Sequence, residues 1–402
     1  MKTKLSLVCG FLAVMFSLSF GACSAAAQGQ RLTGTDAFSF RVINGGTAYS
    51  VSKSTATEGT VNIPAYYRPN ADSDYLPVRE IGSFIGCINI IKITIPASVT
   101  SISYSAFLGC TSLASITIPA SVTSIGHSAF QRCTSLANIT IPASVTHIGK
   151  EAFEGTAWLN SQSDGLVYAG KVLYIYKGKE KMPANTVINN IRDDTIAIAD
   201  RAFSSCTNLT SITIPAGVKS IGGGAFYNCT SLTSITIPAS VTHIGGGSGY
   251  DDDNNYDYGS FYGCTSLETV TFAAGSQLKT IGDYTFSGCT SLTSITIPAS
   301  VTHIGQQAFS PYFSGTRTSL KTVNFAEGSQ LEYIGFKAFS GCTSLTSITI
   351  PASVTKIGEF AFMRWTPSQT INILGHASQA AADAAWIDWR NYCNAKIVYQ
   401  GE

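Results

Sequence analysis

A phrase of about two dozen residues returns along this chain, and that repetition constrains the fold more than any other feature. The stretch GCTSLASITIPASVTSIGHSAFQRC runs from Gly109 to Cys133, and its core returns at Gly263, Gly288 and Gly341. The isoleucines that open the IG..AF phrase are most often 23 residues apart, with longer intervals of 50, 37 and 30. A fixed period of roughly 20 to 30 residues predicts a solenoid in which each repeat forms one coil.

Each coil carries the pattern of one short, half-buried strand. Leu113, Ile116 and Ile118 follow the L-x-x-L-x-L spacing of leucine-rich repeats. Side chains alternate along a strand, so the two isoleucines are expected to point inward, with Ser115 and Thr117 pointing outward. One coil cannot bury this apolar set alone, so we expect coils to stack with parallel strands about 4.8 Å apart.

The repeated phrase LTSITIPASVT, followed by IG, AF and GCTSL, resembles the BspA-like leucine-rich repeat of bacterial surface proteins. The resemblance covers roughly Val61 to Phe362. It implies an α/β-type solenoid, a right-handed leucine-rich-repeat superhelix with a parallel β-sheet. It also implies binding of host matrix or plasma proteins, such as fibronectin or fibrinogen, and aggregation with other cells.

Both ends of the repeat region carry patterns of closing units. FSFRVINGGTAYSVSK, from Phe38 to Lys53, predicts a β-hairpin around an Asn-Gly-Gly turn. The segment from Ile371 to Gln400 predicts a strand, a helix carrying Trp386 and Trp389, and a short strand. Such caps cover the open ends of the core.

These patterns divide the chain into four parts. We predict a signal peptide over 1–22, an N-terminal segment with its hairpin over 23–59, repeats over 60–370 and a C-terminal cap over 371–402. Insertions are expected near 155–195, 245–260 and 310–319. The first should hold two irregular coils, with a strand at 173–175, and insertions of this kind extrude as loops.

The N-terminal segment predicts export. Lys2 and Lys4 precede an apolar stretch and the small residues of FGACSAAAQ, the pattern of a signal peptide. The residues before Cys23 resemble a bacterial lipobox, which makes Cys23 a candidate lipid anchor; the alanines after it offer ordinary cleavage instead. We therefore expect a cell-envelope or cell-surface location, as an outer-membrane lipoprotein or otherwise as a secreted protein.

Charge and motifs argue against several classes of function. Net charge is +1 and only 12% of residues are charged, so the basic face that nucleic acid requires is missing. HExxH, G-x-S-x-G and phosphate-cradling loops are all absent. The histidines of the repeated VTHIG phrase, His147, His243 and His303, are expected to lie more than one coil apart. We predict no enzyme, no cofactor and no confident metal site.

Eight of the eleven cysteines hold the same coil position: Cys87, Cys110, Cys133, Cys206, Cys229, Cys264, Cys289 and Cys342. Zinc sites need closely spaced pairs of ligands, which this pattern lacks. Cysteine is a small buried hydrophobe, so we predict an internal ladder of free thiols. A partly oxidised ladder is the alternative.

The insertion near 245–260 contains DDDNNYD, in which acidic and amide side chains alternate as at the start of a calcium loop. The candidate calcium ligands are Asp251, Asp253, Asn255 and Asp257. Tyr256 replaces the glycine and Tyr262 the final glutamate of such a loop. A flexible polar loop is the alternative interpretation.

The outward strand positions form a neutral polar file, which we interpret either as a solubility ladder or as a docking surface. Its candidate binding residues are Ser115, Thr117, Thr140, Thr213, Thr236, Thr296 and Thr349. Aromatic candidates in the insertions are Tyr250, Tyr256, Tyr258, Tyr312 and Phe313. We expect a monomer that binds a host matrix or plasma protein or a neighbouring bacterial surface, and contacts membrane only through its lipid. Glycan binding and a purely structural envelope role are the alternatives.

Overall fold

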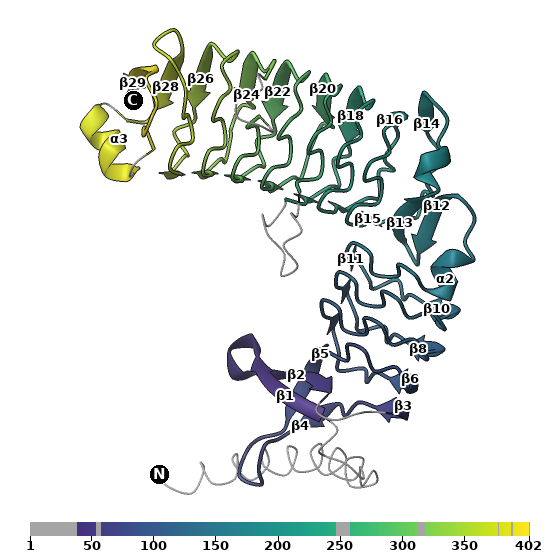
Figure 1. Ribbon diagram of the computed structural model, residues 1–402. Helices are drawn as coiled ribbons and strands as arrows, with labels where there is room; N and C mark the ends of the chain where they lie inside the picture. The colour runs from purple at the N-terminus through teal and green to yellow at the C-terminus, as the bar shows by residue number, and fades with distance from the viewer. Residues whose placement is uncertain are drawn as a thin grey trace, which may run out of the picture.

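The computed structural model describes residues 38–53, 58–246, 258–311, 318–376, 378–386 and 389–401. Coils stack side by side into an arc with two arms that meet at a bend (Figure 1). The predicted signal peptide and Cys23 lie outside the described residues. None of the described helices is long and apolar enough to cross a membrane.

One strand of each coil lies on the outer side of the arc (Figure 1). These strands pair in parallel as β3-β6-β8-β10, β14-β16, β18-β20-β22-β24 and β26-β28. Their bounds are β3 Gly59–Asn62, β6 Ile90–Thr94, β8 Ser115–Thr117, β10 Asn138–Thr140, β14 Thr186–Ile188, β16 Leu209–Ile212, β18 Ser234–Ile237, β20 Thr269–Phe272, β22 Ser294–Ile297, β24 Thr322–Phe325, β26 Ser347–Ile350 and β28 Thr370–Leu374. The predicted parallel solenoid is confirmed.

A second strand of each coil, mostly two residues long, lines the inner side of the arc (Figure 1). Apart from the strand at 173–175, the sequence did not indicate these strands. Their bounds are β5 Leu76–Ile81, β7 Ser101–Ile102, β9 Ser124–Ile125, β11 His147–Ile148, β13 Val172–Lys177, β15 Ala197–Ile198, β17 Ser220–Ile221, β19 His243–Ile244, β21 Thr280–Ile281, β23 His303–Ile304, β25 Tyr333–Ile334 and β27 Lys356–Ile357. They form two sheets, and the break between β11 and β13 lies at the bend.

The core repeats with the coil. Phe130 is fully buried, and its ring stacks between those of Phe107 and Phe153 at centroid distances of 5.3 and 5.6 Å. The Cys133 thiol donates a hydrogen bond to the carbonyl oxygen of Phe107, one coil back, at 3.1 Å. Identical coils therefore contribute identical rings, thiols and aliphatic side chains to the core, which divides at the bend into two clusters, one for each arm.

The N-terminal cap is the predicted hairpin. β1 (Phe38–Ile43) pairs antiparallel with β2 (Ala48–Lys53) through a turn, η2 (Asn44–Gly46), in which Asn44 and Gly45 have positive φ. β2 then pairs in parallel with β5, and the short strand β4 (Tyr66–Tyr67) pairs antiparallel with β5. The hairpin thus continues the inner sheet.

The C-terminal cap contains the predicted strand, helix and short strand, but the helix ends at Ala385, before the two tryptophans that were expected within it. Helix α3 (Gln379–Ala385) begins at Ser378, whose hydroxyl accepts a hydrogen bond from the backbone N–H of Ala381. The last strand, β29 (Lys396–Gln400), pairs in parallel with β28 and completes the outer sheet. Trp386 and Trp389 are buried, so indole rings close this end of the core.

The bend is formed by the segment between the coils of β11 and β15. It contains α2 (Ala157–Asn160), β12 (Gly165–Ala169), β13 and the 3-10 turn η3 (Lys179–Lys181). The predicted strand at 173–175 lies within β13, but β12 and β13 form an antiparallel hairpin, not two stacked irregular coils. The turn residues between the two strands, including Gly170 at φ +63°, allow this chain reversal.

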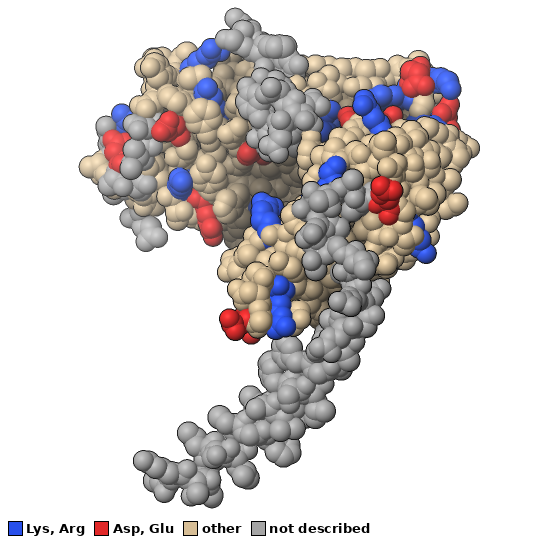
Figure 2. Space-filling view, turned by 60° about the horizontal axis from the view of Figure 1, so that its bottom comes forward, with Lys and Arg blue, Asp and Glu red and all other residues tan. Residues whose placement is uncertain are grey.

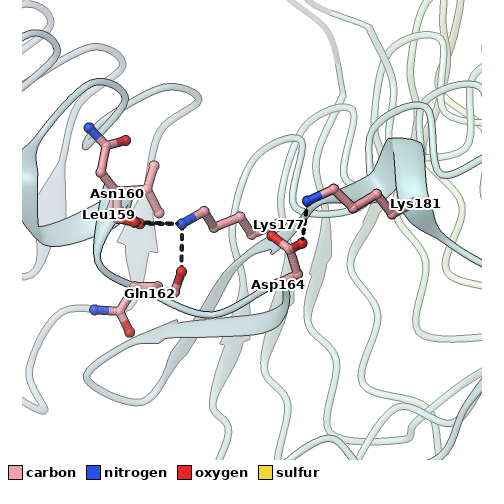
Figure 3. Close-up of polar contacts among 6 residues, drawn as sticks. All are labelled: Leu159, Asn160, Gln162, Asp164, Lys177 and Lys181. Carbon is pink, nitrogen blue, oxygen red and sulfur yellow. Dashed lines mark hydrogen bonds and ion pairs between the residues drawn. The ribbon is translucent and has the colours of Figure 1, made fainter.

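A lysine fixes this segment. The Lys177 ammonium donates to the backbone carbonyl oxygens of Leu159, Asn160 and Gln162 at 3.0, 2.9 and 2.5 Å (Figure 3). Leu159 and Asn160 are the last residues of α2 and Gln162 follows it, in the region where helical carbonyls run out of helical partners. Lys177 therefore joins the hairpin to the short helix before it.

Candidate functional site

The outer strands expose a file of threonine and asparagine side chains. Thr117 pairs in register with Thr94 on one side and Thr140 on the other. The predicted candidates are all exposed: Ser115, Thr117, Thr140, Thr213, Thr236, Thr296 and Thr349. Isoleucines between them point into the core, because side chains alternate along each strand.

The file continues in register for only a few coils at a time. Thr296 pairs with Asn324, and Thr349 pairs with Asn372, whose amide lies 3.5 Å from the threonine hydroxyl. Strand pairing stops between β10 and β14, between β16 and β18, and between β24 and β26. The candidates therefore occupy successive short patches of one outer face.

Two shallow hollows lie on this outer face. One is lined by residues of β20 and β22, including Thr296, and by the turn at Ala273–Ser276. The other is lined by residues of β24 and by Thr349, Pro351 and Leu374. Both hollows are open, and their linings mix polar and apolar groups. They therefore suit the side chains of a partner protein better than a small molecule, which binds in more enclosed pockets.

Charge is sparse on the surface. In Figure 2, Lys, Arg, Asp and Glu side chains are scattered singly or in small mixed groups among uncharged side chains. A partner of the outer-strand face meets hydroxyl, amide and small apolar groups, which provide hydrogen bonds at low desolvation cost.

Of the loop candidates, the structure describes only Tyr258. Its ring stacks on Tyr227 at a centroid distance of 4.4 Å, and the Arg201 guanidinium lies 6.0 Å from its centroid. Tyr258 is half-buried, so part of its ring is committed to these contacts. The other loop candidates lie outside the described residues: Tyr250, Asp251, Asp253, Asn255, Tyr256, Asp257, Tyr312 and Phe313.

The histidines of the VTHIG phrase do not meet one another. His243 and His303 each pair with Thr280, on opposite sides, so a full coil separates them. Both rings are exposed, and each Nδ1 lies within 2.9 Å of the preceding threonine hydroxyl. For these two residues the expected separation is confirmed.

At the bend, however, the structure brings together three side chains that sequence reasoning did not connect. Nε2 of His127 lies 3.0 Å, and Nε2 of His147 lies 3.6 Å, from the same carboxylate oxygen, Oδ2 of Asp200. The three donor atoms lie within 4.8 Å of one another, and no other such group occurs within the described ranges. Asp200 lies in the repeat phrase that begins at Ile198, 50 residues after the phrase that begins at Ile148, so the regular 23-residue spacing gave no signal that it would meet the two histidines.

The eight cysteines that share one coil position are buried and free, as predicted. Each of six thiols donates to the phenylalanine carbonyl of the coil before it, as Cys264 does to Phe226 at 3.1 Å. Burial raises the pKa of Cys206, Cys264 and Cys342 to about 12. These three thiols therefore stay protonated at neutral pH and pack as small apolar groups.

The sequence matches the BspA type leucine rich repeat region in six copies over residues 77–163, 184–252 and 310–384, more than half of the chain. No curated protein matches it.

Solved structures similar to this chain come from bacteria. A leucine rich cell surface protein from Faecalibacterium prausnitzii A2-165 is 25% identical; the match covers 91% of this chain and 94% of that chain, with a TM-score of 0.32. A leucine-rich repeat protein from Eubacterium ventriosum is 21% identical, with coverages of 82% and 92% and a TM-score of 0.40. One from Bacteroides ovatus is 22% identical, with coverages of 92% and 100% and a TM-score of 0.31.

Proposed function

The chain belongs to the BspA type leucine rich repeat family, and from that premise we propose that it is an exported bacterial surface protein that binds other proteins. The partner is a host matrix or plasma protein, or a protein on a neighbouring bacterial cell. The observation that carries this proposal is the exposed polar file on the outer face, held in register by a rigid core.

The physical case rests on the area and chemistry of that face. A stable protein interface covers about 800 Å² on each partner, more than one narrow coil offers. A partner must therefore span several coils, and it would meet a hydroxyl or amide at each outer strand. Such contacts are individually weak, and many copies on one cell would strengthen them through avidity.

Export and anchoring belong to the same proposal. The signal peptide over 1–22 and the lipid on Cys23 would tether a monomer to the envelope, with no other membrane contact. Replacing Cys23 by Ala should release the protein into the medium and remove the lipid mass from its N-terminus. Retention of Cys23→Ala in the membrane fraction would contradict the anchor.

The outer face is tested by adding bulk and charge where the hollows lie. Thr296→Arg and Thr349→Arg should weaken binding to immobilised matrix proteins, plasma proteins or bacterial cells by at least about tenfold, as burial of an unpaired charge predicts. His303→Arg, an equally exposed change on an inner strand, should bind like the wild type. Equal affinities for all three variants would reject the outer face.

The insertion near 245–260 is tested separately. A Cβ on Gly223 would lie 3.3 Å from the Gly246 carbonyl oxygen and 3.8 Å from that of Tyr258, so the two ends of the insertion are close together. A Gly-Ser link can therefore replace 247–257 without disturbing Gly245 and Gly259, which pack against neighbouring coils. If the loop contacts the partner, this replacement weakens binding while the unfolding midpoint stays unchanged.

The alternatives have distinct outcomes. Binding on a glycan array, competed by free sugar, would indicate a glycan-binding protein. An absence of saturable binding to any protein, cell or glycan would indicate a purely structural envelope protein. That the chain is not an enzyme is part of the proposal, since leucine-rich repeats of this kind present surfaces and not enclosed catalytic clefts.

A further inference from the structure

We propose that His127, His147 and Asp200 form a binding site for a divalent transition-metal ion of the zinc type on the inner side of the bend. Two imidazole nitrogens and one carboxylate oxygen are a donor set that zinc accepts with a fourth, open position. This site is independent of the protein-binding face, because His147 lies in an inner strand and His127 and Asp200 each follow one by two residues, whereas the face is formed by the outer strands.

The distances between donor atoms suit a metal. Tetrahedral coordination with bonds of about 2.0–2.1 Å places neighbouring donor atoms roughly 3.4 Å apart. The Nε2 atoms of His127 and His147 lie 3.0 and 3.6 Å from Asp200 Oδ2, on either side of that value. An ion can therefore enter among the three atoms with small rotations of the side chains.

The carboxylate is fixed before any ion binds. Asp200 is 7% exposed, and its other oxygen, Oδ1, accepts a hydrogen bond from the backbone N–H of Gly223 at 2.8 Å. Its own backbone N–H donates to the carbonyl oxygen of Ile148 at 3.1 Å. Hydrogen bonds of this kind orient a ligand and leave the remaining oxygen for the metal.

Glycines of the following coils let the backbone pack closely against His127 and against the Asp200 carboxylate. A Cβ on Gly149 would lie 2.4 Å from the backbone nitrogen of His127, and one on Gly222 would lie 2.4 Å from Asp200 Oδ1. Only glycine permits this approach of neighbouring coils. His147 completes the set from β11, where its side chain is 49% exposed.

The same chain provides a matched position without the cluster. Asp283 follows β21 as Asp200 follows β15, and its Oδ1 accepts a hydrogen bond from the backbone N–H of Gln306 at 2.7 Å. No pair of imidazoles joins that carboxylate within the described ranges. The convergence of three donors is therefore a property of the bend and not of the repeat.

The position of the site gives the ion a structural effect. His127 and His147 belong to the last coils of the first inner sheet, and Asp200 belongs to the second. A bound ion would link the two arms across the break between β11 and β13. Because an ion that binds only the folded chain stabilises it by mass action, the arms should resist unfolding better when it is bound.

The test is calorimetric titration of Zn²⁺ into the full chain after removal of metals by a chelator. We expect one saturable equivalent and a higher unfolding temperature in its presence. His147→Ala should bind at least about tenfold more weakly, as loss of a ligand predicts, and should lose the thermal shift. His303→Ala, which removes an exposed histidine from the same repeat phrase, should behave like the wild type.

A second pair of variants tests the carboxylate. Asp200→Asn should weaken Zn²⁺ binding and Asp283→Asn should not; if Asp200→Asn fails to fold, the exposed His147 variant decides. Ca²⁺, which prefers oxygen ligands, should not displace Zn²⁺. The proposal is overturned if the wild type shows no saturable Zn²⁺ binding. It is also overturned if Zn²⁺ binding is unchanged in His147→Ala, because the ion would then be bound elsewhere, for example by the buried thiols.

Discussion

The hydroxyl of Tyr174 lies 3.0 Å from the backbone nitrogen of Phe153 and accepts its hydrogen bond. In a regular coil the equivalent N–H donates to the next coil, as Phe130 does to the carbonyl oxygen of Ala152 at 2.7 Å. At the bend a side chain takes the place of that carbonyl. The ladder of backbone hydrogen bonds is thus continued by a phenol where the repeat is interrupted.

Tyr174→Phe should therefore destabilise the bend. The variant keeps the ring but leaves a buried N–H without a partner, which costs about 1–3 kcal/mol. Equilibrium urea unfolding measures the loss. Tyr176→Phe, two residues along the same strand and half-buried, is the control and should change little. Equal stabilities of the two variants would show that the phenol hydrogen bond contributes nothing.

Lys177→Met should also loosen the bend. Methionine keeps most of the aliphatic stem, while the three carbonyls at and just after the C-terminal end of α2 lose a charged donor worth roughly 1.5–3 kcal/mol. Hydrogen exchange of the amides in 159–177 should accelerate. Lys181→Met is the control, because Lys181 pairs with Asp164 at the surface, where ion pairs contribute little (Figure 3). The interpretation fails if both variants exchange alike.

Phe130→Ala tests the stacked core of the first arm. Removal of a fully buried phenyl ring leaves a cavity between Phe107 and Phe153 and should cost about 3–5 kcal/mol. The urea midpoint should fall accordingly. Phe336→Ala is the control, because Phe336 also lies in the repeat region but is only half-buried. Its loss of unfolding free energy should be much smaller.

The buried thiols predict a loss of stability in alkali. Burial raises the pKa of Cys264 to about 12, above its ordinary value in the unfolded chain. Its stabilising contribution is complete below about pH 8.5 and declines as pH rises toward 12, by on the order of 1 kcal/mol per pH unit. Urea unfolding between pH 8 and 11 measures this slope. Cys264→Val should show a shallower slope than the wild type; parallel slopes would contradict the prediction.

The regular coils and both caps could be predicted from the sequence because each depends on local pattern and nearest neighbours. Ile116 and Thr117 alternate as a strand requires, and the next coil repeats them in register. The inner strands were missed because two residues, such as Ser124–Ile125, are too short to show alternation.

The bend and its cluster could not be predicted for a different reason. Asp200 meets His147 only because the segment between them folds into an antiparallel hairpin, and that fold depends on tertiary contacts of Tyr174 and Lys177. No period links these residues. The outer-face candidates were placed correctly as exposed residues, while their role in binding remains a prediction.

The register of the outer strands, in which Thr94, Thr117 and Thr140 follow one another, has an evolutionary consequence. If a gene gains or loses one whole repeat among these coils, the coils on either side of the change still make the same contacts as before. Unequal recombination between the near-identical phrases can therefore lengthen or shorten either arm in one event. The sequence of the bend occurs only once, so it offers no second copy for recombination. We therefore expect related proteins to keep the contacts of the bend while their arms differ in length.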